Sequence, residues 1–149
     1  MVKPAFYSLL HGVNLLYLSE PKSKEMEIKT AKKIFIVDDD EMLTMAMTDY
    51  LSKEGHSDIR VFHTGEDCVK HISENPDVVI LDFYLNTVEK DAANGLEVLE
   101  AMREQLPKAR FIMLSSQESY SKAAQTLQKG AEQYVIKDGE AFRKIAEII

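Results

Sequence analysis

Residues 34–39 read Ile-Phe-Ile-Val-Asp-Asp, and residues 78–82 read Val-Val-Ile-Leu-Asp. Each is a short run of β-branched and aliphatic residues that ends at a carboxylate. Continuous apolar runs of this length are typical of strands that are covered on both faces, as in a parallel sheet between two helix layers. Three similar runs occur elsewhere, so the sequence predicts five strands, at residues 34–37, 59–62, 78–81, 111–114 and 134–136.

Longer stretches with helical spacing of apolar residues follow the strands. The expected helices span residues 41–54, 65–74, 95–105, 119–129 and 140 to the end. The first has a stripe that we expect in the core, and it ends at Gly55, which can serve as the C′ residue; the stripe is Leu43, Ala46, Met47, Tyr50 and Leu51. Alternating strands and helices predict an α/β fold with a parallel sheet between helix layers.

Composition limits the function classes. The 149 residues are enough for one domain, and the formal net charge is -7. An acidic surface repels phosphate backbones, which argues against direct binding of nucleic acid. Apolar runs are too short to cross a membrane. A lone Cys68 excludes an internal disulfide framework and fits a reducing compartment, so we expect a cytoplasmic protein with Cys68 in the core.

Residues 1–30 break the pattern and are expected to precede the main domain, residues 31–149. Apolar side chains recur at helical spacing between residues 6 and 17, and residues 19–30 are a polar linker. Polar residues and a glycine interrupt the apolar run, which disfavours a secretory signal. Two interpretations stay open: an amphipathic helix that docks on its own domain or on a second copy in a homodimer, or a non-native leader before Met26.

Polar side chains follow the predicted strands where a ligand would bind. In an open parallel sheet, ligands bind outside the carboxyl ends of the strands. Asp38 and Asp39 follow the first strand, Asp82 the third, Ser115 the fourth and Lys137 the fifth. Crowded carboxylates repel and raise one another's pKa, and a divalent cation would remove that penalty. Carboxylate oxygens suit Mg²⁺, so the pattern indicates a magnesium site.

Four motifs in this order resemble the receiver domain of response regulators, the phosphoacceptor part of two-component signalling. They are Ile-Phe-Ile-Val-Asp38-Asp39, Val-Val-Ile-Leu-Asp82-Phe, Phe-Ile-Met-Leu-Ser115 and Tyr134-Val-Ile-Lys137. The resemblance covers residues 31–149, about four-fifths of the chain. It implies a flavodoxin-like, doubly wound (βα)5 three-layer sandwich with strand order 2-1-3-4-5.

The resemblance also implies roles for individual residues. Asp82 would accept a phosphoryl group from a sensor histidine kinase or a histidine phosphotransfer protein. Mg²⁺ would be held by Asp38, Asp39, Asp82 and the backbone carbonyl of Tyr84, and it would balance charge during the transfer. Lys137 would pair with Asp82 before the transfer and with a phosphoryl oxygen afterwards.

The same resemblance implies a signalling switch and not a classical enzyme. Ser115 would donate its hydroxyl to a phosphoryl oxygen and draw its loop inward, while Tyr134 changes rotamer to fill the vacated space. The output would be a changed face around the fourth helix, fifth strand and fifth helix. The kinase, the signal and the target are left open, as is whether an output domain follows Ile149.

The sequence departs from the family pattern in three places. Asp138 follows Lys137 where the family usually has a cis proline, so we expect a trans bond, with Asp138 as N-cap of the last helix. Residues 86–94 look like an insertion beside the site. Tyr84 and Gln117 flank the path of attacking water in this family, and a bulky Tyr84 predicts slow self-dephosphorylation.

Two other functions stay open. Asp38 and Asp40 form an Asp-x-Asp pair, as in Mg²⁺-dependent phosphohydrolases that use the first aspartate as nucleophile. That function needs a substrate cap and a later acidic pair, and neither is evident. A pseudo-receiver that only binds partners is the other alternative. Asp40 and Glu41 are interpreted as stabilising the start of the first helix.

Overall fold

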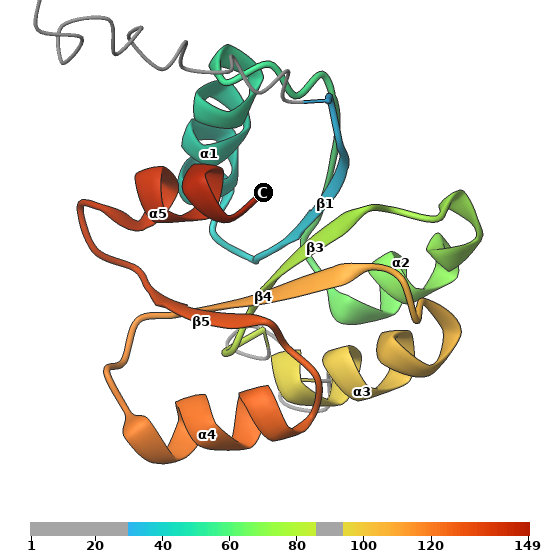
Figure 1. Cartoon of the computed structure of the whole chain (residues 1–149), viewed down its shortest axis with the longest axis vertical. Helices are drawn as coiled ribbons and strands as arrows, with labels where there is room; N and C mark the ends of the chain where they lie inside the picture. The colour runs from blue at the N-terminus through green and yellow to red at the C-terminus, as the bar shows by residue number, and fades with distance from the viewer. Residues whose placement is uncertain (1–29, 86–93) are drawn as a thin grey trace, which may run out of the picture.

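The computed structural model describes residues 30–85 and 94–149. Five parallel strands pair in the order β2-β1-β3-β4-β5, which confirms the predicted order (Figure 1). Each expected strand is found to within one residue at either end. The strands are β1 (Lys33–Val37), β2 (Asp58–Phe62), β3 (Val78–Asp82), β4 (Arg110–Ser115) and β5 (Gln133–Ile136).

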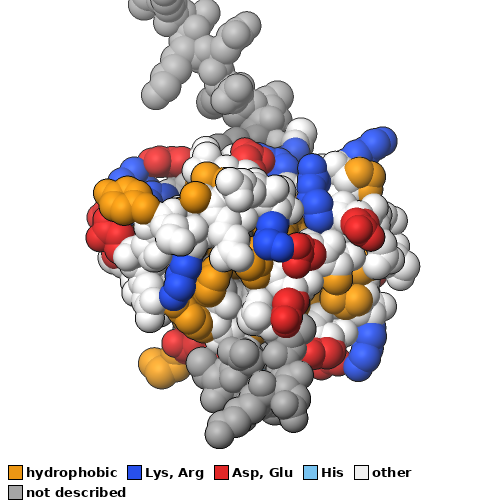
Figure 2. Space-filling model, turned by 90° about the horizontal axis from the view of Figure 1, so that it is seen from below, with side chains coloured by type: hydrophobic (Ala, Val, Ile, Leu, Met, Phe, Trp, Pro, Cys, Tyr) orange, Lys and Arg blue, Asp and Glu red, His pale blue; other side chains and the backbone are white. Residues whose placement is uncertain are grey.

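Helices cover both faces of this sheet. They are α1 (Glu41–Lys53), α2 (Gly65–Lys70), α3 (Gly95–Gln105), α4 (Tyr120–Gln128) and α5 (Ala141–Ile148). Figure 1 shows α1 and α5 together on one side of the strands, and α2, α3 and α4 on the other. Figure 2 views the α3 and α4 side, where charged side chains of both signs lie among apolar ones. The predicted three-layer α/β sandwich is therefore confirmed.

The alternation of side chains along the strands divides the core in two. Along β1, Phe35 and Val37 belong to the α2 and α3 core, whereas Ile34 and Ile36 pack with α1 and α5. Cys68 is fully buried in the first of these cores, as expected, with its Sγ 3.6 Å from Met102 Sδ. Burial raises the pKa of the Cys68 thiol to about 12, so it stays neutral and unreactive.

The buried stripe of α1 differs by one position from the expected one. Thr44 is buried and Ala46 is exposed. The Thr44 hydroxyl donates to the Glu41 carbonyl at 3.0 Å, so its polar atom is satisfied inside the helix. The ends of α1 agree with the prediction: the Asp40 side chain accepts from the Leu43 N–H, and Gly55 follows the C-cap with φ +100°.

The second helix is shorter than predicted. Residues 65–74 were expected as one helix, but α2 ends at Lys70 and a 3₁₀ turn, η2 (Ile72–Glu74), follows. The His71 N–H bonds to the Cys68 carbonyl at 2.9 Å, which tightens the chain from α-helical to 3₁₀ spacing. Pro76 disfavours a helical conformation at Asn75, which instead has φ 50° and turns the chain into β3.

Gly95 brings α3 against the strand end that carries Asp82. A Cβ atom on Gly95 would lie 2.0 Å from the Asp82 carbonyl oxygen, so no other residue fits without movement of the backbone. The helix begins with a capping box, in which the Asn94 side chain accepts from the Glu97 N–H and Glu97 bonds back to the Asn94 N–H. The start of α3 therefore fixes one wall of the site.

The start of α5 corrects one prediction. The bond between Lys137 and Asp138 is trans as expected, but Asp138 is not the N-cap of the last helix. Glu140 occupies that position without a side-chain capping bond, and the Asp138 carboxylate accepts from the Glu140 N–H at 2.9 Å. Aspartate forms this local turn readily, which moves the start of the helix to Ala141.

Two predicted segments fall largely outside the described residues. They are the leader and linker at residues 1–30 and the insertion at residues 86–94, of which Thr30 and Asn94 are described. Within the described ranges, no helix is both long enough and apolar enough to span a bilayer.

Candidate functional site

Two adjacent strands bring the predicted acidic residues together. Val37 pairs with Leu81, so Asp38 and Asp82, each one residue further on, meet at the carboxyl edge of β1 and β3. Both are buried, with 1% and 3% of the residue exposed. One carboxylate oxygen from each of Asp38, Asp39 and Asp82 lies within 4.8 Å of the others. The predicted acidic cluster is thus present as a compact group.

Lys137 reaches this group from the far side of β4. Its Nζ lies 2.8 Å from Asp38 Oδ2 and 3.2 Å from Asp82 Oδ1. The Lys137 N–H bonds to the Ser115 carbonyl at 2.8 Å, which continues the β4–β5 ladder beyond Ile136 and fixes the start of the side chain. The long lysine side chain then spans β4 to reach the carboxylates on β3 and β1.

The charges in the site are unbalanced. Burial, and then the carboxylate of Asp38, raise the pKa of Asp82 above its usual value, and Lys137 opposes this rise only in part. Burial lowers the pKa of Lys137, but the two carboxylates outweigh it and raise that pKa overall. Lys137 therefore stays protonated, and its one ammonium is shared by the two buried carboxylates of Asp38 and Asp82.

This donor set fits a divalent cation. Asp38 Oδ2 and Asp82 Oδ1 are buried, and both have the single Lys137 ammonium as their ion-pair partner. One positive charge shared by two buried carboxylates leaves negative charge uncompensated, and a hard cation such as Mg²⁺ binds oxygen ligands of this kind. The residues present therefore fit the expected magnesium site, with Asp38, Asp39 and Asp82 as its side-chain ligands.

Asp40 orients the site without belonging to the acidic group. Its N–H donates to Asp38 Oδ1 at 3.0 Å, and its carboxylate caps α1 by accepting from the Leu43 N–H at 3.0 Å. The interpretation of Asp40 as a helix-start residue is confirmed. The Asp38 backbone also contacts a residue that the sequence did not connect with the site: His63 Nδ1 lies 3.0 Å from the Asp38 carbonyl.

Ser115 and Tyr134 both bond to Gln117. The fully buried Ser115 Oγ accepts from the Gln117 N–H at 3.2 Å. The Tyr134 hydroxyl donates to the Gln117 carbonyl at 2.9 Å. The two residues predicted to form the switch are therefore joined through the loop between β4 and α4.

A cluster that we call the clasp, formed by Tyr84, Gln117 and Lys122, links the loops that follow β3 and β4. The Tyr84 hydroxyl donates to Gln117 Oε1 at 2.6 Å, and Lys122 Nζ donates to the same oxygen at 2.7 Å and to the Tyr84 hydroxyl. The sequence pointed to Tyr84 and Gln117 but missed Lys122. A lysine in the first turn of a partly exposed helix carries no sequence signal that would have singled it out.

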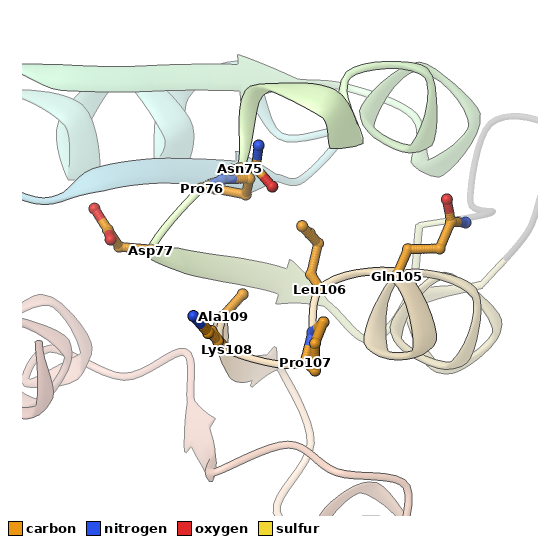
Figure 3. A pocket seen from close by; sticks show the side chains of 8 residues that line it. All are labelled: Asn75, Pro76, Asp77, Gln105, Leu106, Pro107, Lys108 and Ala109. Carbon is orange, nitrogen blue, oxygen red and sulfur yellow. The ribbon is translucent and has the colours of Figure 1, made fainter.

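A separate hollow lies at the opposite edge of the sheet. It has a volume of about 350 Å³ and is formed by residues 75–77, which lead into β3, and residues 105–109, which lead into β4 (Figure 3). None of the predicted site residues lines it. The acidic group, at the carboxyl ends of the strands, is thus remote from this hollow.

Comparison with known proteins decides the family. The model of the response regulator receiver domain matches residues 34–149, which is most of the chain. The chain belongs to this family. The receiver domain is 31% identical over 121 residues to the response regulator protein VraR of Staphylococcus saprophyticus, a match that covers 78% of this chain and 54% of that protein. It therefore spans about half the length of this curated relative.

Solved structures agree on the fold. The signal receiver domain of a putative Luxo repressor protein from Vibrio parahaemolyticus is 25% identical, with a TM-score of 0.69, and the match covers 80% of this chain and 88% of that one. The BeF3-activated DrrB receiver domain is 26% identical, with a TM-score of 0.68 and coverages of 80% and 95%. The predicted family and the predicted fold are both confirmed. A response regulator receiver domain is a signalling domain and not a classical enzyme.

Proposed function

We propose that this receiver domain is a phosphorylation switch in which Asp82 accepts a phosphoryl group from a sensor histidine kinase or a histidine phosphotransfer protein. The observation that carries the proposal is the buried Asp82 carboxylate at the end of a central strand, with Lys137 3.2 Å away and Asp38 and Asp39 within metal-ligand distance. A buried carboxylate beside an acidic cluster and a cation is typical of a functional site.

The transfer needs a deprotonated carboxylate that can approach an anionic phosphoryl group. An Asp82 oxygen attacks the phosphorus, the new O–P bond forms as the P–N bond of the phosphohistidine breaks, and the imidazole leaves with its electron pair and takes up a proton. Lys137 favours the ionised form of Asp82 and then pairs with a phosphoryl oxygen. Mg²⁺ held by Asp38, Asp39, Asp82 and the Tyr84 carbonyl would supply electrostatic stabilisation of the transferred group.

The switch follows from the hydrogen bonds of Ser115. Its hydroxyl now contacts the Gln117 carbonyl at 3.4 Å, so it is free to turn to a phosphoryl oxygen at the cost of a weak bond. Gln117 would move with it, and the Tyr134 hydroxyl, which donates to the same carbonyl, would follow. The consequence is a changed face around α4, β5 and α5.

Labelling with a small donor tests the proposal. Incubation with radiolabelled phosphoramidate and Mg²⁺ should label the native domain, and Asp82→Asn should abolish the label. Asp49→Asn, an equal charge change at an exposed position of α1, is the control and should keep it. A label that depends on Asp38 as nucleophile would instead support a phosphohydrolase. Absence of both label and Mg²⁺ binding would support a pseudo-receiver.

The phosphoryl donor is proposed to dock beside α1. Met42 and Met45 are 83% and 74% exposed on this helix, which begins at the carboxyl edge of the sheet. Exposed methionines adapt to a partner surface. Met42→Gln with Met45→Gln should slow phosphotransfer from a kinase or phosphotransfer protein but not from phosphoramidate. Slowing with both donors would point to damage at Asp82 and contradict docking.

Location and assembly are also proposals. A cytoplasmic location is supported by the lone, buried Cys68, which suits a reducing compartment. Homodimerisation is proposed to involve the apolar residues that precede the domain. Deletion of residues 1–25 should then lower the mass measured in solution by light scattering, and an unchanged mass would contradict a dimer contact there.

A further inference from the structure

Lys122 joins α4 to both loops at the mouth of the site. Tyr84 lies two residues beyond Asp82, and Gln117 lies two residues beyond Ser115, so the Tyr84–Gln117 bond crosses from the β3 loop to the β4 loop. Lys122 donates to both ends of this bond. The ammonium therefore holds together the side chain two residues beyond Asp82 and the side chain two residues beyond Ser115.

The position of the Lys122 side chain is held by two kinds of interaction. Besides its two hydrogen bonds, Nζ lies 5.4 Å from the centroid of the Phe83 ring. A cation over an aromatic face at this distance is attracted to it. The directions of the bonds agree: Lys122 donates to the Tyr84 hydroxyl, and that hydroxyl donates its own proton to Gln117.

We propose that Lys122 is a positioning residue that holds Tyr84 and Gln117 together across the mouth of the Asp82 site and so slows hydrolysis of the phosphorylated form. The inference rests on the proposed function. In the hydrolysis, a water oxygen attacks the phosphorus, the bond between phosphorus and the Asp82 oxygen breaks, and the water proton passes to the phosphate released. Restricting where water can approach therefore lengthens the lifetime of the phosphorylated state.

Lys122 acts through its neighbours and not as a second phosphate ligand. Its ammonium already has two oxygen acceptors in the clasp, whereas Lys137 is the cation beside Asp82. Because Lys122 belongs to α4, any partner or movement that displaces this helix also opens the clasp. The lifetime of the signal is thereby linked to the position of the helix expected to carry the output.

Decay of the phosphorylated domain tests the inference. Lys122→Ala should raise the rate of loss of label by about fivefold, the effect of about one hydrogen bond. Lys122→Arg, which keeps donors and charge, should restore a slow rate. Lys129→Ala is the matched control, because it removes the same charge at the other end of α4, where Lys129 pairs with Glu100. It should leave the rate unchanged.

A second variant separates the clasp from a direct effect of charge. Tyr84→Phe keeps the ring but removes the shared hydroxyl, so it should accelerate decay as Lys122→Ala does, and the double variant should be no faster than either. A native rate in Tyr84→Phe, or equal acceleration by Lys122→Ala and Lys129→Ala, would overturn the inference.

Hydrogen exchange of the unphosphorylated domain tests the role of Lys122 in the clasp independently of whether Asp82 is phosphorylated. Residues 116–122 should exchange faster in Lys122→Ala than in the native domain or in Lys129→Ala, since the clasp no longer holds the loop. Unchanged exchange would overturn the claim that Lys122 holds the loop in place, even if Asp82 is phosphorylated. Failure of Asp82 to take label in all variants would overturn the proposed function and the claim about lifetime, whatever the exchange shows.

Discussion

Lys137 Nζ lies 3.2 Å from Asp82 Oδ1, although the two residues leave strands that are separated by β4. The contact forms because the β4–β5 ladder continues to the Lys137 N–H and because Asp82 ends β3 at the same edge. Lys137 also lies 2.8 Å from Asp38 Oδ2, so this cation, which follows β5, joins Asp38, which follows β1, to Asp82, which ends β3. The site is therefore a property of the assembled sheet.

Loss of a carboxylate from the acidic group should weaken Mg²⁺ binding. Asp38→Asn and Asp39→Asn each remove a charged oxygen ligand, and we expect affinity to fall at least about tenfold, since even outer-shell partners of a metal have effects of this size. Calorimetric titration with MgCl₂ measures it. The control is Asp49→Asn on the exposed surface of α1, and an equal loss of affinity there would contradict the assigned ligands.

Asp82→Asn should stabilise the metal-free domain. The raised pKa of Asp82 means that the folded state disfavours its charged form, and asparagine removes that charge. We expect a gain of about 1 kcal/mol in the free energy of unfolding, or about 3 °C in Tm, in buffer with chelator at neutral pH.

The sign of this effect fixes its pH dependence. A carboxylate whose pKa is raised by folding lowers stability as pH rises from its ordinary pKa to its folded pKa, and the loss is complete above the folded value. The advantage of Asp82→Asn over the native domain should therefore shrink as the pH is lowered through this window. An advantage that is independent of pH, measured by thermal unfolding, would contradict the assigned cause.

Dephosphorylation of the isolated domain should be slow and should depend on Tyr84. Replacing the aromatic side chain by the smaller one in Tyr84→Asn opens the space beside Asp82 and should raise the rate of loss of label on the order of tenfold. The measurement is the decay of radiolabelled domain after removal of the donor. A native lifetime of seconds that Tyr84→Asn leaves unchanged would count against the shielding role.

Ser115→Ala should still allow phosphorylation of Asp82 but should prevent the conformational change that follows it. The variant keeps Asp82 and Lys137, so it should still take label, but the β4–α4 loop loses the hydroxyl that is proposed to contact the phosphoryl group. Hydrogen exchange in residues 116–136 should change on phosphorylation of the native domain and not of Ser115→Ala. Ser116→Ala is the adjacent control, and the same loss in that variant would contradict the choice of Ser115.

The central strands β1, β3 and β4 were predictable because they are buried on both faces. The apolar runs at residues 34–37 and 78–81 are continuous. A strand with one exposed face would instead alternate apolar and polar residues, so these runs indicate strands that are covered on both faces. Placing Asp38 and Asp82 at one edge then followed from the topology. Their proximity to Lys137 came from the family resemblance, because no spacing in the sequence reports a contact between residues 82 and 137.

The features that the sequence did not predict depend on local hydrogen bonds and on where side chains lie in the folded chain. Asp138 is a residue type that often caps helices, but its carboxylate accepts from the Glu140 N–H, and it lies two residues before the N-cap, Glu140. Thr44 is buried because its hydroxyl bonds within the helix, which a hydrophobicity pattern does not include. Lys122 lies in a helix with other polar residues, and only the folded chain shows that its ammonium meets Tyr84 and Gln117.

Chemical mapping of the phosphorylated residue tests the central claim most directly. The domain is labelled with phosphoramidate and Mg²⁺, the acyl phosphate is reduced with borohydride to homoserine, and the modified residue is located by mass spectrometry of the peptides. The account predicts homoserine at position 82. Homoserine at position 38, or at no carboxylate of the acidic group, would contradict it.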